Sequence, residues 1–124
     1  MPTTVNAIRN SLEKTDLWLK DLKEIGAFET EEQAYTALRA ALHTIRDRLT
    51  VEEATHLGAQ LPLVIRGFYY EGWRPALAPN KERTKDQFLE SVVESLRTAQ
   101  HKITPEVALA STFELLKKHI APGQ

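Results

Sequence analysis

The stretch that decides the fold is Thr30–Leu61, TEEQAYTALRAALHTIRDRLTVEEATHLGAQL, because a related stretch returns as Thr84–Leu115, TKDQFLESVVESLRTAQHKITPEVALASTFEL. Each copy has the pattern of a helix, a short turn that ends in threonine, and a second helix. Neither hairpin can bury its apolar face alone, so the repeat predicts two stacked helical hairpins. The residues identical in both copies are Thr30/Thr84, Gln33/Gln87, Leu42/Leu96, Thr44/Thr98, Thr50/Thr104, Glu52/Glu106, Ala54/Ala108 and Leu61/Leu115.

Threonines mark the predicted starts of helices. Thr30 and Thr50 each open a capping box, in which the threonine accepts a hydrogen bond from the third amide and the Gln or Glu at that third position reaches back. Thr104 precedes Pro105, which suits the first helical position because its missing N–H costs nothing there. No segment alternates like a strand, so the chain is predicted to be all-α.

Apolar residues at helical spacing predict which faces are buried. Pro62 interrupts the helix that begins after Thr50, and it should either kink that helix or split it. The residues expected to face the core are Ala34, Leu38, Ala41, Leu42, Ile45 and Leu49, then Ala54, Leu57, Leu61, Val64, Ile65 and Phe68, then Phe88, Leu89, Val92, Leu96 and Ala99, and finally Leu109, Phe113, Leu116 and Ile120.

An N-terminal helix is predicted over residues 4–25, with Gly26 as its C-cap. Thr15 interrupts its apolar stripe, which leaves a start near Thr15 as an alternative. Leu17 and Trp18 are expected to be exposed on a second apolar face, which favours a homodimer. The predicted stripe consists of Val5, Ile8, Leu12, Leu19 and Leu22.

These elements predict one domain over residues 1–124, a bundle of five or six helices. It comprises the N-terminal helix (4–25), a first hairpin (30–73), a linker with two prolines (74–83) and a second hairpin (84–120). The linker is assigned because its prolines and lack of periodicity are typical of loops.

The composition of the chain argues against several classes of function. The chain has 124 residues, a net charge of −1 and no cysteine. A balanced charge with acids and bases interspersed argues against nucleic acid and anionic membranes as partners. The absence of cysteine removes disulfides and thiolate chemistry. Neither a signal peptide nor a membrane span is recognisable, so a cytoplasmic protein is expected.

Catalytic and metal-binding patterns are weak. Glu53 and His56 have the Glu-x-x-His spacing of di-iron bundles, but Val107 and Ala110 occupy the matching positions of the second copy. The serines lie within predicted helices, and the four histidines are scattered as surface residues or cap contacts. No glycine-rich phosphate loop is present. The chain is therefore expected to be no enzyme and to bind no metal or cofactor.

A basic face lies along the helix that follows Thr30. Arg39, His43 and Arg46 share this face, as they would on the recognition helix of a DNA reader. However, Glu52 and Glu53 open the next helix, and their carboxylates would repel the phosphates of DNA. A solvated face with local ion pairs is the favoured interpretation.

The segment from Arg66 to Trp73, RGFYYEGW, is the sharpest local signal, because aromatics beside arginine are typical of interface hot spots. One interpretation is that Phe68, Tyr69 and Trp73 close the core. The other is an interaction surface for an unknown protein or for a second copy. A third hypothesis is a small-molecule pocket between the hairpins near Tyr69, Tyr70 and Trp73. The candidate surface residues are Arg66, Tyr69, Tyr70, Glu71, Trp73 and Arg74.

The chain resembles the bacterial domain of unknown function family 2267 over about residues 15–120. The resemblance implies an all-helical bacterial protein and transfers no established activity or catalytic residue. A non-catalytic interaction or self-association module is therefore the favoured function. The resemblance rests on Trp18-Leu19-Lys20, Ala34-Tyr35, Leu38-Arg39-Ala40, Leu42-His43, Arg46-Asp47-Arg48-Leu49, Glu53-Ala54, Gln60-Leu61-Pro62, RGFYYEGW-x-Pro and Asp86-Gln87-Phe88-Leu89.

Overall fold

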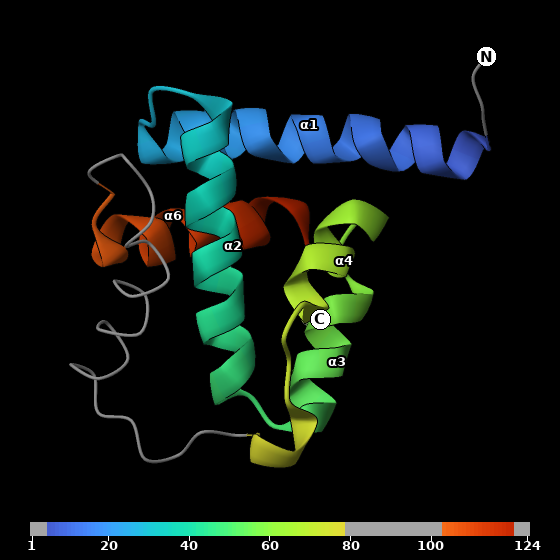
Figure 1. Cartoon of the computed structure of the whole chain (residues 1–124). Coiled ribbons are helices and arrows are strands. Elements are labelled where there is room, and N and C mark those ends of the chain that lie inside the picture. The colour runs from blue at the N-terminus through green and yellow to red at the C-terminus, as the bar shows by residue number, and fades with distance from the viewer. Residues whose placement is uncertain (1–4, 79–102, 121–124) are drawn as a thin grey trace.

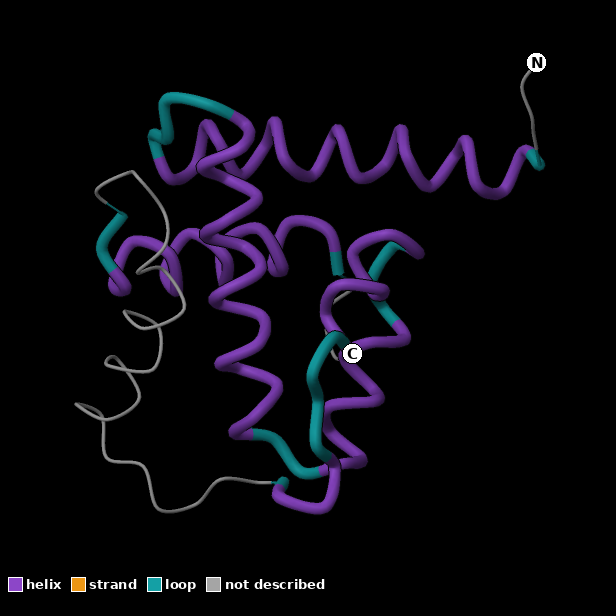
Figure 2. The backbone as a smooth tube through the Cα atoms, in the orientation of Figure 1, coloured by secondary structure: helices purple, strands orange, loops and turns teal. Residues whose placement is uncertain are grey.

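A computed structural model describes residues 5–78 and 103–120 of the chain. The predicted all-α class is confirmed: the described residues contain α-helices, one 3₁₀ turn and no strand. The predicted helix after Thr84, its apolar stripe and the linker from residue 79 lie outside the described residues. The elements are α1 (Asn6–Gly26), α2 (Glu31–Arg48), α3 (Val51–Ala59), α4 (Leu63–Tyr70), η1 (Pro75–Leu77) and α6 (Pro105–His119) (Figures 1 and 2).

Helix α2 is the centre of the arrangement. It crosses both α1 and α6, and it packs against α4, while α3 and α4 stand together at its side (Figure 1). The N-terminal end of α1 extends past the other helices (Figure 2). The bundle therefore has a compact body and one projecting helical end.

The predicted caps are present at the described helix starts. Thr50 accepts from the Glu53 amide at 3.1 Å, and the Glu53 carboxylate accepts from the Thr50 amide at 3.0 Å. Thr30 also caps α2, but the Gln33 side chain reaches back to the amide of Glu29 instead of to that of Thr30. The local chemistry was predicted correctly, and the exact partner of Gln33 was not.

Pro62 splits the helix. Helix α3 ends at Ala59 and α4 begins at Leu63, with Pro62 at the N-cap position in an extended conformation (φ −58°, ψ 153°). Proline removes a backbone donor and clashes with a preceding helical turn, so the chain reverses here instead of bending. Two short helices replace one long one.

The predicted buried face of α1 is wrong over its first half. The helix begins at Asn6, so the alternative start near Thr15 is wrong as well. Val5, Ile8 and Leu12 are 63%, 47% and 53% exposed. The prediction failed because the first turns of α1 lie beyond the body that would cover them. The buried residues of α1 are Ser11, Thr15, Trp18 and Leu22.

Two further predictions on α1 are corrected. Trp18 is 5% exposed and belongs to the core, whereas Leu17 is exposed as expected. Gly26 is the last helical residue, and the left-handed C-cap conformation falls on Ala27 (φ 55°). The glycine has a different role, because a Cβ at Gly26 would collide with the ring of Phe28.

The core follows the α2 prediction closely. The residues expected on the inner face of α2 are buried or, for Leu49, half-buried. Ala37 and Ala41 of α2 pack with Ala108 of α6, so small side chains let these helices approach closely. On α6 the prediction of an inward Phe113 is wrong, since that ring is 50% exposed. The main core cluster is Trp18, Leu22, Ala34, Leu38, Leu42, Leu61, Ile65, Tyr69 and Leu115.

Candidate functional site

The RGFYYEGW segment is tied to α3 by two side chains. The Arg66 guanidinium donates from Nε to the Gly58 carbonyl at 3.0 Å and from Nη2 to the Leu61 carbonyl at 2.9 Å. The Tyr69 hydroxyl donates to the Ala54 carbonyl at 2.7 Å. Burial raises the pKa of the Tyr69 phenol far above its usual range, so it stays a neutral donor. The acceptors are carbonyls of α3 and of the turn that follows it, so these bonds fasten α4 to that part of the chain.

The basic face of α2 holds the C-terminal end of α4. Arg46 donates from Nη1 to the carbonyls of Tyr69 at 2.8 Å and Glu71 at 2.7 Å. His43 donates from Nε2 to the Phe68 carbonyl at 2.5 Å. Arg39 forms an exposed ion pair with the Glu71 carboxylate at 3.4 Å. The face makes local ion pairs as expected, but Arg46 is 4% exposed, so the prediction of a solvated face is wrong there.

Protonation of His43 is set by this packing. Burial lowers its pKa below the ordinary value of 6.5, and the charges of Arg46 and Arg39 lower it further. The hydrogen bond to the Phe68 carbonyl acts in the opposite direction. At pH 7 the neutral imidazole therefore donates to α4 from Nε2. This half-buried, neutral imidazole thus serves to hold the end of α4.

The N-terminal end of α4 is held by α1. Pro62 offers no side chain that could cap α4. Ser11 of α1 fills that role, since its Oγ accepts from the Val64 amide at 3.1 Å. Ser11 in turn accepts on its backbone carbonyl from the Thr15 hydroxyl at 2.8 Å. Helix α4 is thus anchored at both ends by neighbouring helices.

The aromatic side chains fill the space around this anchor. Tyr70 lies over Gly58, where a Cβ would collide with its ring and hydroxyl. The Tyr70 ring contacts Tyr69 edge-on with centroids 4.9 Å apart, and it contacts Trp73 at 5.4 Å. Gly72 supplies the positive φ of 71° in the turn that brings Trp73 back. Within the described part of the chain, the buried Trp73 Nε1 has no hydrogen-bond partner.

The six candidate surface residues differ in how far they are buried in the structure. Tyr69 is a core residue with no exposed area, and Arg66, Tyr70 and Trp73 are half-buried. Glu71 and Arg74 are exposed. A partner at this surface would therefore meet the two charged residues and the outer edges of Tyr70 and Trp73.

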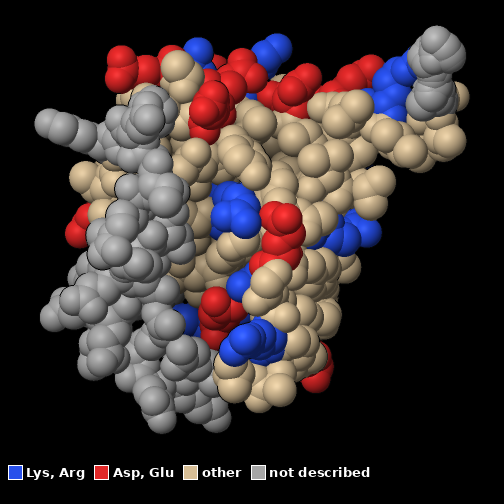
Figure 3. All heavy atoms as spheres, in the orientation of Figure 1, with Lys and Arg blue, Asp and Glu red and all other residues tan. Residues whose placement is uncertain are grey.

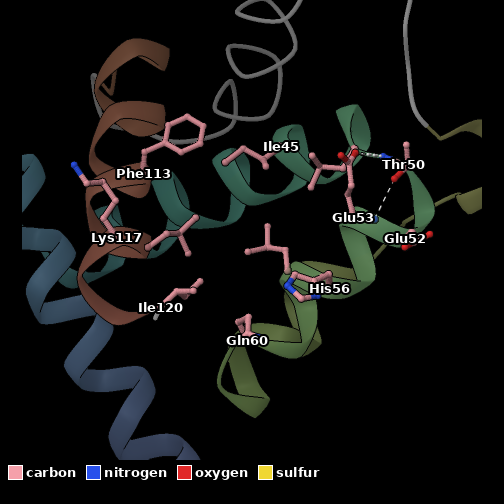
Figure 4. Close-up of a pocket in the computed structure, with 12 residues that line it drawn as sticks. Ile45, Thr50, Glu52, Glu53, His56, Gln60, Phe113, Lys117 and Ile120 are labelled. Atoms are coloured by element: carbon pink, nitrogen blue, oxygen red, sulfur yellow. Dashed lines mark hydrogen bonds between the residues drawn. The ribbon is translucent and has the colours of Figure 1, made fainter. Parts of the chain in front are cut away.

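A cleft of about 790 Å³ lies between α2, α3 and α6 (Figure 4). Its walls are mostly apolar, with Glu52, Glu53 and His56 on the α3 side and Lys117 on the α6 side. Tyr69, Tyr70 and Trp73 are not among its lining residues, so it differs in position from the predicted pocket. The lining residues are Ile45, Leu49, Thr50, Glu52, Glu53, His56, Leu57, Gln60, Phe113, Leu116, Lys117 and Ile120.

The Glu53-x-x-His56 pair does not form a metal centre in the described chain. The Glu53 carboxylate is engaged with the Thr50 amide, and His56 is exposed. Over residues 5–78 and 103–120, no group of three His, Cys, Asp or Glu residues is placed to hold a metal ion.

Sequence reasoning missed a contact between α1 and α6. His119 donates from Nε2 to the Asp21 carboxylate at 2.7 Å, and its ring stacks on Trp18 with centroids 4.8 Å apart. Lys118 approaches the same carboxylate at 3.2 Å. The hydrogen bond from His119 lowers the pKa of Asp21, and Lys118 adds to this effect. The partners are far apart in sequence, so nothing in the local pattern could reveal the pair.

Acidic and basic side chains are both present on the face in Figure 3. Acidic ones predominate along α1, and the two signs are interspersed over the region of α2 and α4. Of the helices in the described part, none combines the length and the apolar composition that a bilayer crossing requires.

The comparison with protein families gives one match. The family described as "Uncharacterized conserved protein (DUF2267)" matches residues 15–124, most of the chain. Among curated proteins, none matches the sequence. The match begins inside α1, after its projecting turns, and includes Arg46, His43 and Tyr69, whereas Ser11, which caps the N-terminal end of α4, lies before it. The chain belongs to the DUF2267 family, whose members are described as uncharacterised conserved proteins.

Proposed function

We propose that this chain is a cytoplasmic, non-catalytic module of a bacterial cell that acts by binding another protein chain through the N-terminal end of α1. The observation that supports this is the exposure of Val5, Ile8 and Leu12 on a helix that projects from the body. Apolar side chains that are clustered and uncovered are typical of interaction sites. The projecting turns of α1 gain little stability from helix propensity alone. Contact with a partner would therefore stabilise them.

The bonding of the polar groups supports a non-catalytic role. His43, Arg46 and His119 hold helix ends or helix pairs together, and Glu53 closes a capping box. A general acid or base must reach a substrate proton, and these groups are already committed to neighbours in the fold. Their chemistry is therefore explained by the architecture.

Site-specific photocrosslinking in cells tests the proposal. A photoreactive residue at Ile8 should give a crosslinked species of defined mass. The same residue at Thr55, which is exposed on α3, serves as the control and should give none. Equal crosslinking at both positions, or none at Ile8, would contradict a specific interaction through α1.

Small-molecule binding is the second candidate function, and the cleft between α2, α3 and α6 favours it. Its apolar walls with a few polar groups are typical of ligand sites. An anionic naphthalene dye that fluoresces in apolar sites should bind the native protein and lose affinity in Phe113→Asp. Val107→Asp on the same helix is the matched control, because Val107 is exposed and does not line the cleft. Equal loss in both variants would contradict a site in the cleft.

A further inference from the structure

Helix α1 carries a second row of apolar residues beside its buried face, and the body covers this row only toward Leu19, which packs against the core. At 3.6 residues per turn, Val5, Ile8, Leu12 and Leu19 fall within a sector of about 60°. The buried residues Ser11, Thr15, Trp18 and Leu22 are centred about 80° away around the helix. The first sector runs from the exposed Val5 to the half-buried Leu19. We call Val5, Ile8, Leu12 and Leu19 the free stripe.

Two opposite charges lie beside the free stripe. Arg9 and Asp16 flank it on the side away from the body, and both are exposed. Neither forms an ion pair with another residue that the structure describes. They stand at nearly equal distances on either side of Leu12 along the helix.

We propose that the free stripe pairs with the same stripe of a second copy in an antiparallel arrangement, with the two-fold axis near Leu12. This inference rests on the proposed function and names its partner. In an isologous pair about this axis, Leu12 faces Leu12 of the second copy and Val5 faces Leu19. Arg9 then lies within one residue of Asp16 of the second copy, and the same contact repeats across the axis.

The charges favour the antiparallel pair over a parallel one. In a parallel pair the two-fold axis runs along the helices, so Arg9 and Asp16 of the two copies would lie on opposite edges of the interface and would form no ion pair across it. An unrelated partner would need its own complementary charges. The second copy supplies apolar residues and opposite charges at matching positions from the same helix.

Sedimentation equilibrium on the full chain measures the pairing. Native protein should dimerise, and Leu12→Glu should abolish the dimer because it places two carboxylates together at the axis. Leu17→Glu is the matched control, because Leu17 is equally exposed on a different side of α1 and should leave the dimer intact. Thermal unfolding of both variants verifies folding.

Charge exchange then tests the register. Arg9→Asp and Asp16→Arg should each raise the dimer dissociation constant about tenfold, because each creates two like-charge contacts. The double variant should restore the native constant, since opposite charges again face each other. Failure of the double variant to recover would overturn the antiparallel register.

The outcomes separate this inference from the proposed function. A native protein that stays monomeric at every concentration overturns pairing with a second copy. If Ile8 still crosslinks in cells to a chain of another mass, the interaction module stands with a different partner. If neither dimer nor crosslink forms, the module itself is contradicted.

Discussion

Helix α4 is mostly apolar and is held by its neighbours, whereas the N-terminal half of α1 carries a narrow apolar stripe that is exposed. Helix α4 has eight residues, too few to be stable alone, and it donates hydrogen bonds to α1 and α3 and accepts hydrogen bonds from α2. Val5 and residues 6–10 of α1 are all exposed. The most conspicuous motif in the sequence thus holds the fold together, and an inconspicuous stretch of α1 is the one that we propose to bind a partner.

The same substitution on both helices is the strongest test of this contrast. Ile65→Ala should cost about 4 kcal/mol of unfolding free energy, because Ile65 is fully buried and the change leaves a cavity. Ile8→Ala should cost less than about 0.5 kcal/mol, because Ile8 is largely exposed. Chemical denaturation at low protein concentration measures both. Similar costs would show that α1 is covered within the monomer.

Removing the clamp on α4 should have the next largest effect. Arg46→Met keeps the aliphatic stem but leaves the carbonyls of Tyr69 and Glu71 without their donor, at a cost of about 3 kcal/mol. Arg39→Met is the control and should cost less than about 0.5 kcal/mol, since its ion pair is exposed. Urea unfolding of the two variants distinguishes a buried clamp from a surface contact.

Two glycines give a smaller contrast of opposite sign. Gly58→Ala should destabilise by about 1 kcal/mol, because the new methyl group collides with Tyr70 and must displace it. Gly67→Ala should stabilise by about 0.5 kcal/mol, because the space beside this helical residue is open and alanine is the better helix former. Thermal unfolding measures both. A stabilised Gly58→Ala would mean that Tyr70 does not pack on α3.

The pH dependence of stability should show the smallest effect. The folded pKa of His43 lies below its ordinary value of 6.5, so the unfolded chain binds the proton first as the pH falls. Stability should therefore decline from just below pH 6.5 until the folded pKa is passed. His43→Gln, which keeps a side-chain donor, should flatten this part of the profile. An unchanged profile would place the imidazole in solvent.

Local rules predicted most of the helices and the face of α2. The caps at Thr30, Thr50 and Thr104 and the break at Pro62 were recoverable because each depends on neighbouring residues. The buried face of α1 was not. An apolar stripe in the sequence shows which residues of a helix could be buried. The burial of Ser11 and Thr15 depends instead on which part of α1 the other helices cover.

The site was predicted less well because its contacts join distant residues. Arginine at position 46 has the pattern of a surface residue, and its burial follows from carbonyls contributed by α4. The aromatic run suggested both a core and a surface, and the structure assigns Tyr69 to the core while Glu71 and Arg74 stay exposed. The pair of Asp21 and His119 has no sequence signal at all.

The packing of Ala37 and Ala41 of α2 against Ala108 of α6 bears on the order in which the domain is completed during synthesis. Leu115 joins the core that Leu22 and Leu38 share, and Ala108 meets the alanines of α2. Helix α6, which closes this interior, thus leaves the ribosome after α1, α2, α3 and α4. Until α6 is synthesised, the apolar faces of α1 and α2 stay uncovered on the nascent chain. Chaperones protect growing chains that expose such surfaces.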